Sequence, residues 1–298
     1  MLREGLVVRT HGGHYYVQAN DTVFDCGVRG RLKQRKTRRD LVVIGDRVRW
    51  SPTEEGRGVI EEILPRASKL SRRLSHSDAE QVLVANLDQV LVVFAVQNPP
   101  LSPFVLDRYL VACEAAELLP IIVVNKIDLL PSGSSPDVLD LYRRIGYKCV
   151  YASAKARENL GTIRNLIQDR ISTLVGPSGT GKSSILNAMW PHVNQKVGEI
   201  SDYHDQGRHT TVVSELLNPE PGVYIADTPG LRRFHLWDVD PEQLEAFFPE
   251  MEPYLNECHF ATCTHMHEPK CAVRRAVDEG EIDSARYESY RRLFQENA

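Results

Sequence analysis

Short runs of β-branched and aromatic residues occupy the first 65 positions of the chain, and turn-forming residues such as Gly12-Gly13 and Asn20-Asp21 separate them. Runs of this kind predict short strands. Because no helical pattern lies between them, we expect a small five-stranded barrel. The predicted strands are Gly5–Thr10, His14–Ala19, Thr22–Val28, Leu41–Trp50 and Gly58–Ile63.

From about residue 86 the pattern changes to apolar strands that alternate with helices, which predicts a mainly parallel sheet covered on both faces. The strand-like segments are Leu87–Val96, Pro120–Asn125, Lys148–Ser153, Ser172–Gly176, Val212–Leu217 and Gly222–Asp227. The helix-like segments are Pro103–Leu118, Pro136–Ile145, Asn159–Ile171, Lys182–Trp190 and, after residue 238, Pro241–Phe248 and Asp283–Gln295. The stretch Pro65–Ser77 lacks apolar periodicity and is interpreted as a linker.

The net charge of −4 conceals an asymmetry, because residues 1–75 hold 16 lysines and arginines against 9 acidic residues. Seven of these basic residues lie between Arg29 and Arg39, in the loop after the third predicted strand. A basic loop suits phosphate contacts, and an OB-like barrel is a common nucleic-acid binder. One of the adjacent Tyr15 and Tyr16 should face outward, where it could stack a base. A solvated charged face without a partner is the alternative.

The apolar fraction of 42% is that of an ordinary soluble globular protein. The longest apolar runs, such as Val90–Val96, are too short to span a bilayer, and Met1–Gly5 shows no apolar signal segment. We therefore expect a cytoplasmic protein without a membrane partner, although an organellar mature form is an alternative. In a reducing compartment the six cysteines should not form disulfides.

The segment Gly176–Ser183 reads Gly-Pro-Ser-Gly-Thr-Gly-Lys-Ser and matches G-x-x-x-x-G-K-[ST] between a predicted strand and a predicted helix. In such a loop the backbone N–H groups surround phosphates, the lysine reaches the β and γ oxygens, and the serine hydroxyl ligates Mg²⁺. The expected nucleotide contacts are Gly176, Pro177, Ser178, Gly179, Thr180, Gly181, Lys182, Ser183 and Ser184. Lys182 is also expected to act in catalysis.

A second motif, Asp227-Thr228-Pro229-Gly230, follows an apolar strand. An aspartate at that place holds Mg²⁺, and the Gly230 amide can meet the γ-phosphate. The polar segment 202–211 is interpreted as a switch loop, in which Thr210 or Thr211 supplies a second Mg²⁺ ligand. Leu231 stands where Ras-like enzymes carry the glutamine that orients water, so slow hydrolysis is expected. His209 is a candidate for orienting that water, or else a solvated loop residue.

The tetrapeptide Asn125-Lys126-Ile127-Asp128 predicts that the base of the bound nucleotide is guanine. The Asp128 carboxylate can accept hydrogen bonds from guanine N1–H and the exocyclic amine, whereas adenine would leave it unpaired. Asn125 would contact the base edge or neighbouring loops, and the Lys126 stem would cover the face of the base. Ser153-Ala154-Lys155 would offer a backbone N–H to guanine O6. Both base motifs precede the phosphate loop, which is a permuted order relative to Ras-like GTPases.

Three cysteines and a histidine lie within 14 residues, spaced Cys258-x4-Cys263-x-His265-x5-Cys271. Four soft or borderline ligands from one short segment suit tetrahedral Zn²⁺ without an open position, hence a structural site. His259 and His267 are nearby alternatives to His265 as the fourth ligand.

Together these features closely resemble the RsgA (YjeQ) family of bacterial ribosome-biogenesis GTPases. The resemblance implies an OB-fold barrel at residues 1–68, a circularly permuted α/β GTPase domain at 69–237 and a helical zinc domain at 238–298. It also implies GTP/GDP, Mg²⁺ and one structural Zn²⁺, with the nucleotide site on 125–128, 176–184 and 227–230 and the zinc site on the three cysteines and His265.

In that family the protein binds rRNA late in maturation of the small ribosomal subunit, and the subunit stimulates GTP hydrolysis. A monomer is expected. One alternative is a nucleotide-gated RNA-binding module with incidental hydrolysis, which Leu231 favours. Another is a P-loop ATPase in which Asn125–Asp128 occurs by accident.

Overall fold

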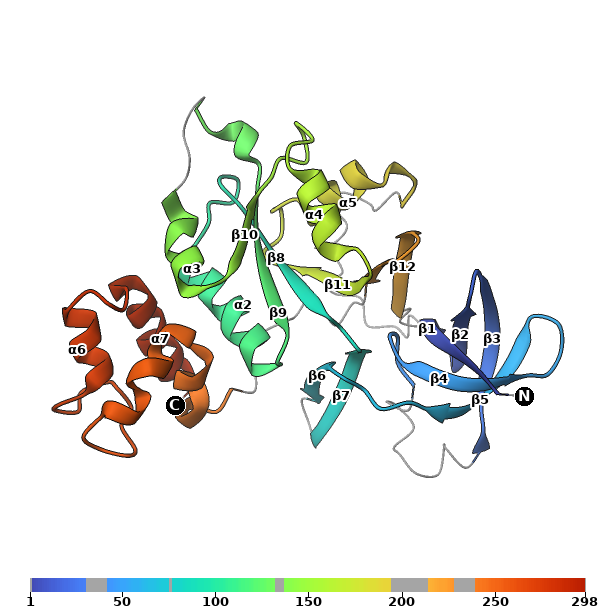
Figure 1. Ribbon diagram of the computed structural model, residues 1–298, viewed down its shortest axis with the longest axis horizontal. Coiled ribbons are helices and arrows are strands. Elements are labelled where there is room, and N and C mark those ends of the chain that lie inside the picture. The colour runs from blue at the N-terminus through green and yellow to red at the C-terminus, as the bar shows by residue number, and fades with distance from the viewer. Residues whose placement is uncertain are drawn as a thin grey trace.

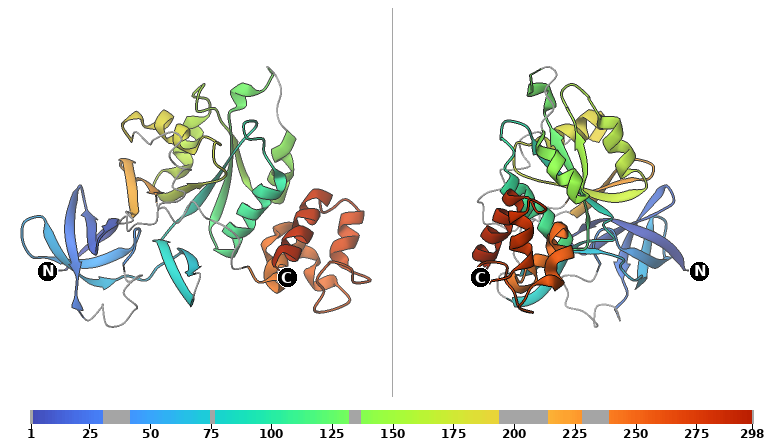
Figure 2. Two further views of the ribbon diagram at one scale, coloured as in Figure 1. Left: turned by 180° about the vertical axis from the view of Figure 1, so that it is seen from behind. Right: turned by 60° about the vertical axis from the view of Figure 1, so that its left-hand side comes forward.

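The computed structural model describes residues 2–30, 42–74, 77–131, 137–193, 214–227 and 239–297. A β-barrel lies at one end of the chain, an α/β domain in the middle and a helical domain at the other end (Figure 1). The view from behind shows the same order of the three parts (Figure 2). No helix among the described residues is long and apolar enough to cross a membrane.

The barrel contains strands β1 (Arg3–His11), β2 (His14–Ala19), β3 (Thr22–Val28), β4 (Arg47–Pro52) and β5 (Arg57–Ile63). They pair in the order β1-β2-β3-β5-β4, and β4 returns to pair with β1, which closes the barrel. Alternate side chains of these strands point inward and form an apolar interior, including Val7, Val17, Trp50 and Ile60, each 0% exposed. The predicted five-stranded OB-like barrel is confirmed.

The fourth strand begins at Arg47 rather than at Leu41, which lies outside the described residues. The chain turns at Gly45, whose φ is +84°, and the Asp46 carboxylate accepts a hydrogen bond from the Val43 N–H at 2.9 Å. A Cβ at Gly45 would lie 1.9 Å from the Ala85 carbonyl oxygen. The predicted strand was too long because apolar residues before Arg47 pack around this turn instead of extending.

Within the expected linker, Lys69–Leu74 instead form strand β6, which pairs as a hairpin with β7 (Ser77–Ala85). The pairing shifts register between Leu70 and Ser71 and again between Arg73 and Leu74. Such bulges interrupt the alternation of side chains between the two faces of a strand. The period of two by which a strand is detected is therefore missing from the sequence here, and the linker prediction was wrong.

The α/β domain has five parallel strands in the order β10-β9-β8-β11-β13, with β12 antiparallel to β13. Their bounds are β8 Gln89–Ala95, β9 Leu119–Asn125, β10 Lys148–Tyr151, β11 Arg170–Val175, β12 Ser214–Glu220 and β13 Val223–Asp227. The helices are α2 Pro103–Ala115, α3 Asp140–Ile145, α4 Leu160–Ile167 and α5 Lys182–Met189, with 3₁₀ segments η1 Ile127–Leu129, η2 Asp137–Leu139 and η3 Pro191–Val193.

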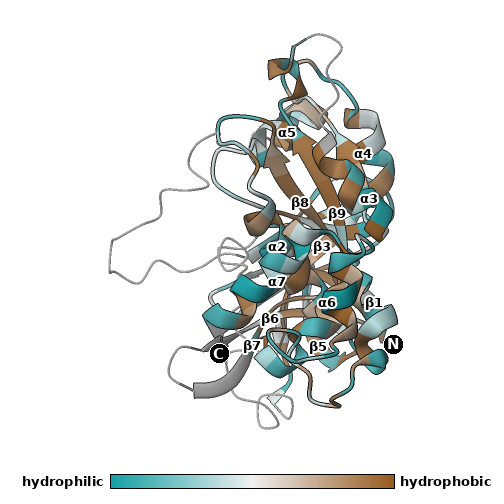
Figure 3. Cartoon of the chain, turned by 90° about the vertical axis from the view of Figure 1, so that its left-hand side faces the viewer, coloured by the Kyte–Doolittle hydropathy of each residue, from teal (hydrophilic) through white to brown (hydrophobic). Residues whose placement is uncertain are grey.

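Helices cover both faces of this sheet, as the alternation of strands and helices predicted. Val92 and Phe94 of β8 share one core with α2 and α3, whereas Leu91 and Val93 share another with α4 and α5. Strands β8 and β9 are mainly hydrophobic, and the neighbouring helices α3 and α4 carry hydrophilic as well as hydrophobic residues (Figure 3). Helix α4 ends at Ile167, before the predicted end, because Asp169 has a φ of +56° and β11 then begins at residue 170.

The C-terminal domain consists of η5 (Pro241–Phe247), η6 (Pro249–Glu257), α6 (Ala272–Asp278) and α7 (Ser284–Asn297). Both helical segments expected after residue 238 are present, and α6 is an addition that the sequence pattern did not predict. The domain core includes Phe248, Met251 and Tyr290, and it packs on Val111 and Ala112 of α2. The zinc motif lies between η6 and α6.

Candidate functional site

The phosphate loop connects β11 to α5, as predicted, and its glycines permit close packing. Gly176 has a φ of +133°, and a Cβ there would lie 2.1 Å from the Val93 carbonyl oxygen. Gly181 has a φ of +93°, and a Cβ there would lie 2.2 Å from Asn125 Nδ2. A side chain at either place would push the loop away from β8 and from the base motif.

Two side chains of this loop point toward its own backbone. The Lys182 ammonium donates to the carbonyl oxygens of Gly176 at 2.8 Å and Pro177 at 2.7 Å. The Thr180 hydroxyl donates to the same Pro177 carbonyl at 3.0 Å. Ser178 and Gly179 at the tip are exposed, and Ser184 is half-buried in the first turn of α5. The loop thus carries a lysine beside the backbone of a glycine-rich turn, which is the chemistry of phosphate binding.

The side chains expected to hold Mg²⁺ lie on neighbouring elements at the same edge of the sheet. The Ser183 hydroxyl is buried and has no hydrogen-bond partner within the described part of the chain. Asp227 ends β13, which pairs with β11, and the Thr173 hydroxyl donates to the Ala226 carbonyl at 3.1 Å. A buried hydroxyl without a partner costs about 1–3 kcal/mol. Coordination of a hard cation by the Ser183 hydroxyl would remove that cost. The oxygen atoms of Ser183 and Asp227 therefore fit Mg²⁺.

The Asn125 side chain is 1% exposed and connects the base motif to two other loops. Its Nδ2 donates to the Thr180 carbonyl at 3.0 Å, and its Oδ1 accepts from the Ala154 N–H at 3.0 Å. The sequence left open whether Asn125 contacts the base or neighbouring loops, and the structure places it on the loops. It holds the phosphate loop and the segment after β10 at a fixed separation.

The Asp128 carboxylate is exposed and accepts a hydrogen bond from the Ser153 hydroxyl at 2.5 Å. The same hydroxyl accepts from the Ala156 N–H at 2.9 Å, which orients it. The Lys126 ammonium donates to the Asn98 carbonyl, and Lys155 is exposed. The residues predicted to contact guanine therefore lie around one surface at the carboxyl ends of β9 and β10.

Several predicted residues lie outside the described part of the chain. They are Thr210 and Thr211, His209, Gly230, Leu231 and most of the basic loop between Arg29 and Arg39. One of Tyr15 and Tyr16 was expected to face outward, but Tyr16 packs against the core of the α/β domain, and the Arg9 guanidinium lies 3.8 Å from its ring centroid. Tyr15 faces the barrel core, so neither tyrosine is a free stacking surface.

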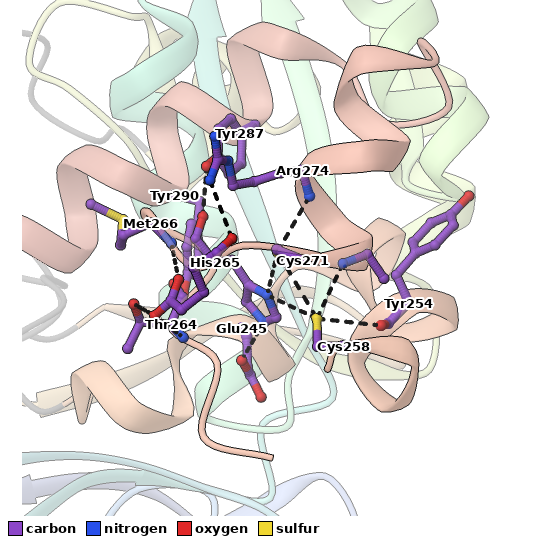
Figure 4. A network of polar contacts seen from close by, with 12 residues as sticks. Glu245, Tyr254, Cys258, Thr264, His265, Met266, Cys271, Arg274, Tyr287 and Tyr290 are labelled. Atoms are coloured by element: carbon purple, nitrogen blue, oxygen red, sulfur yellow. Dashed lines mark hydrogen bonds and ion pairs between the residues drawn. The ribbon is translucent and has the colours of Figure 1, made fainter. Parts of the chain in front are cut away.

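The three cysteines and His265 come together in the C-terminal domain, with all four ligand atoms within 4.8 Å of one another. His265 Nδ1 lies 3.5 Å from Cys258 Sγ and 3.3 Å from Cys271 Sγ (Figure 4). His259 and His267 are exposed and outside this group. A closed set of three thiols and one imidazole fits a structural Zn²⁺ site.

Groups around this cluster orient its members. His265 Nε2 lies 2.6 Å from Glu245 Oε2 of η5, so Nδ1 faces the thiols (Figure 4). The Ala272 N–H donates to Cys258 Sγ at 3.4 Å and the Arg274 N–H to Cys271 Sγ at 3.5 Å, which favours thiolates. Sequence reasoning did not find Glu245, because it lies 20 residues from His265 with no motif spacing.

The loop that carries His265 is held by Glu268 and by α7. Burial raises the pKa of Glu268, but hydrogen bonds from the Thr264 hydroxyl and from nearby backbone N–H groups outweigh it and lower the pKa to about 2. The Tyr287 hydroxyl donates to the His265 carbonyl at 2.6 Å, and the Tyr290 hydroxyl to the Thr264 carbonyl at 2.8 Å. The group of three cysteines and His265 is thereby joined to the terminal helix.

A base motif, a phosphate loop and a magnesium-type carboxylate at one edge of a parallel sheet, with the base motif first in the chain, define a circularly permuted GTPase. The model of the RsgA GTPase family matches residues 63–237, and that of the RsgA N-terminal domain matches residues 4–60. The chain belongs to the RsgA family of GTPases. The predictions of family, fold class and GTPase activity are confirmed.

Relatives match over nearly the whole chain. The small ribosomal subunit biogenesis GTPase RsgA of Moorella thermoacetica is 40% identical over 287 residues, covering 96% of this chain and 94% of that protein. The protein of the same name from Actinobacillus pleuropneumoniae is 39% identical over 302 residues, covering 99% and 85%.

Two solved structures are also similar. YjeQ from Thermotoga maritima has a TM-score of 0.78 at 34% identity, covering 100% of this chain and 99% of that one. YloQ, a circularly permuted GTPase, has a TM-score of 0.79 at 31% identity, covering 100% and 95%.

Proposed function

We propose that this protein hydrolyses GTP during maturation of the small ribosomal subunit, binds the rRNA of that subunit and is stimulated by it. The observation that carries the proposal is the match, over 96% of the chain, to a relative named small ribosomal subunit biogenesis GTPase. We further propose that it acts as a cytoplasmic monomer, with domains at 1–68, 69–237 and 238–298.

In this proposal the Asp128 carboxylate accepts hydrogen bonds from the guanine edge, and a backbone N–H of Ser153-Ala154-Lys155 donates to guanine O6. Asn125 positions the segment after β10 through the Ala154 N–H and the phosphate loop through the Thr180 carbonyl. The loop N–H groups and Lys182 bind the phosphates, for which Lys182 must leave its present carbonyl partners. Mg²⁺ would be held by Ser183 and Asp227, and when bound it neutralises charge that develops on the phosphates.

The remaining roles rest on the chain's own residues. Thr210 or Thr211 completes the magnesium ligands, the Gly230 amide contacts the γ-phosphate, and His209 orients water. The cluster around His265 holds structural Zn²⁺, which supports the C-terminal fold and takes no part in chemistry. Leu231 replaces the glutamine that would orient water in Ras-like enzymes, so the isolated protein should hydrolyse GTP slowly.

The test is GTP turnover by the zinc-loaded protein, measured alone and with small ribosomal subunits, with large subunits and free tRNA as controls. A slow basal rate that small subunits alone raise strongly supports the proposal. Equal stimulation by any RNA, or none, contradicts the ribosomal part.

A second candidate, a nucleotide-gated RNA-binding module, is favoured by Leu231. Single-turnover rates with saturating subunits separate the two. A hydrolysis rate that the subunit leaves unchanged, together with nucleotide-dependent RNA affinity, favours the module.

A further inference from the structure

The barrel and the GTPase domain share one continuous sheet. Strand β1 pairs with β12, which in turn pairs with β13, so that the strand order runs from the GTPase domain into the barrel without a break (Figure 1). Among the residues that the structure describes, two pairs make the connection, Arg9 with Glu215 and Thr10 with Ser214. Strand β12 directly follows the predicted switch segment in sequence, and β13 ends at Asp227.

The register aligns four side chains across four strands. Tyr16 of β2 is opposite Arg9, Arg9 is opposite Glu215, and Glu215 is opposite Asp227. Directly opposite residues of antiparallel strands point to the same face of the sheet, with Cβ atoms about 4.5–5.5 Å apart. A row of facing residues therefore runs from the predicted magnesium carboxylate to a tyrosine of the barrel.

The charges along this row depend on one another. Glu215 and Asp227 are neighbouring carboxylates, and like charges on opposite residues repel. Arg9 brings a positive charge to the strand position on the other side of Glu215, and its guanidinium lies 3.8 Å from the centroid of the Tyr16 ring. A cation bound at Asp227 would reduce the repulsion between the Asp227 and Glu215 carboxylates. It would thereby change how strongly Glu215 attracts Arg9.

Two further contacts join the same elements. Val8 of β1 is buried in the core that contains Leu216 of β12 and Ala226 of β13. The Tyr224 hydroxyl of β13 donates to Gln18 Oε1 of β2 at 3.4 Å. Because packed strands move together, a displacement at the end of β13 is transmitted to β1 and β2.

We propose that the β1–β12 junction couples the nucleotide site to the barrel, with Arg9 and Glu215 as positioning residues for Asp227. This inference rests on the proposed function, because it assumes that the barrel binds rRNA and that its affinity for rRNA depends on the nucleotide bound in the GTPase domain. Coupling of this kind is reciprocal: if GTP changes the affinity for RNA by some factor, RNA changes the affinity for GTP by the same factor.

The test measures that factor in the full chain as the ratio of affinities for small subunits with a non-hydrolysable GTP analogue and with GDP. We expect a ratio of at least about fivefold in the unmodified protein, as is usual for coupled sites. Arg9→Ala and Glu215→Ala should each bring the ratio close to one. The double variant should lose no more than either single variant, because the two residues act in one row.

Arg57→Ala is the matched control, since Arg57 is an exposed arginine of the same barrel on β5, away from β12. It removes the same charge and should lower RNA affinity equally in both nucleotide states, so that the ratio stays unchanged. A ratio of one in the unmodified protein, or an undiminished ratio in Arg9→Ala and Glu215→Ala, overturns the inference.

Amide hydrogen exchange of the isolated chain gives a second readout without ribosomes. Protection of β1 and β2 should differ between the GTP-analogue and GDP states, and the difference should vanish in Glu215→Ala. Identical protection in both states of the unmodified protein overturns the coupling. Failure of the proposed function looks different, because the chain would then bind no guanine nucleotide or no small subunit at all.

Discussion

The Arg286 guanidinium of α7 donates to the Asp107 carboxylate of α2 at 2.6 Å, and both side chains are 1% exposed. The same guanidinium contacts both carboxylate oxygens of Glu250, at 2.6 and 3.2 Å. Burial lowers the pKa of Arg286, but the two carboxylates outweigh this effect and raise it, so that the side chain stays charged. This buried ionic group joins the C-terminal domain to the GTPase domain.

Arg286→Met should destabilise this junction by about 3–5 kcal/mol, because it leaves the buried Asp107 and the largely buried Glu250 without a cation. Arg286→Lys should lose less, since it keeps the charge but cannot bridge two carboxylates in the same way. Hydrogen exchange of the α7 amides measures the change in opening free energy. Arg275→Ala is the control, because its pair with Glu257 is exposed and worth about 0–1 kcal/mol. Equal effects of Arg286→Met and Arg275→Ala would contradict the structural role.

The strands and their chemistry were predictable where local pattern and motif coincide. Gly176–Ser183 and Asn125–Asp128 both lie at the ends of apolar strands. The sequence predicted the correct elements for them because an apolar run directly before a motif supports the assignment of both the strand and the motif. The Arg286 junction was not predictable, since Arg286 and Asp107 lie 179 residues apart and each looks like an ordinary charged residue on a helix. Its existence depends on which two helices pack together.

The barrel shows the same limit at the level of strands. Regular strands such as His14–Ala19 were predicted to the residue, because side chains alternate without interruption. The hairpin of β6 and β7 was missed because its bulges remove the alternation, and the row from Tyr16 to Asp227 could not be seen without the register between β1 and β12. Pairing between distant strands is a tertiary property that no local period records.

Asp128→Asn should lower the affinity for GTP by at least about a hundredfold, because the amide oxygen can still accept from guanine N1–H but the amide NH2 meets the exocyclic amine, which also donates. The same variant should gain affinity for xanthosine triphosphate, whose C2 carbonyl can accept from the new amide. Competition binding with the two nucleotides measures both changes. Asp140→Asn, an exposed carboxylate on α3, is the control and should change neither affinity more than about twofold. A parallel loss for both nucleotides would remove Asp128 from the base site.

Ser183→Ala should separate stability from function. Without nucleotide, removal of a buried hydroxyl that has no described partner should leave the protein as stable or about 1 kcal/mol more stable. The gain in GTP affinity on adding Mg²⁺ should nevertheless fall by about tenfold or more, since a magnesium ligand is lost. Thermal melting and nucleotide titration with Mg²⁺ or EDTA measure the two effects.

Ser172→Ala is the matched control for that variant. Ser172 is buried on β11, but its hydroxyl accepts a hydrogen bond from Gln89 Nε2 at 3.0 Å. Its loss should destabilise the fold by about 1–3 kcal/mol and leave the magnesium dependence of GTP affinity unchanged. A Ser183→Ala protein that is destabilised like Ser172→Ala, with its magnesium dependence intact, would show that Ser183 is only structural.

Removal of zinc should unfold residues 239–297, because this short segment depends on the metal cluster as well as on its small core. His265→Ala should lower zinc affinity by more than about a hundredfold, which is the upper range for loss of an outer partner of a ligand. Glu245→Ala should lower zinc affinity by about 10–100-fold, because Glu245 only orients His265.

Zinc content by elemental analysis and competition with a chelator measure the zinc affinity of these variants, and protease sensitivity of residues 239–297 reports whether the segment is folded. His267→Ala and Cys149→Ala, both outside the cluster, should retain one zinc per chain. Metal loss in His267→Ala with retention in His265→Ala would instead make His267 the fourth ligand.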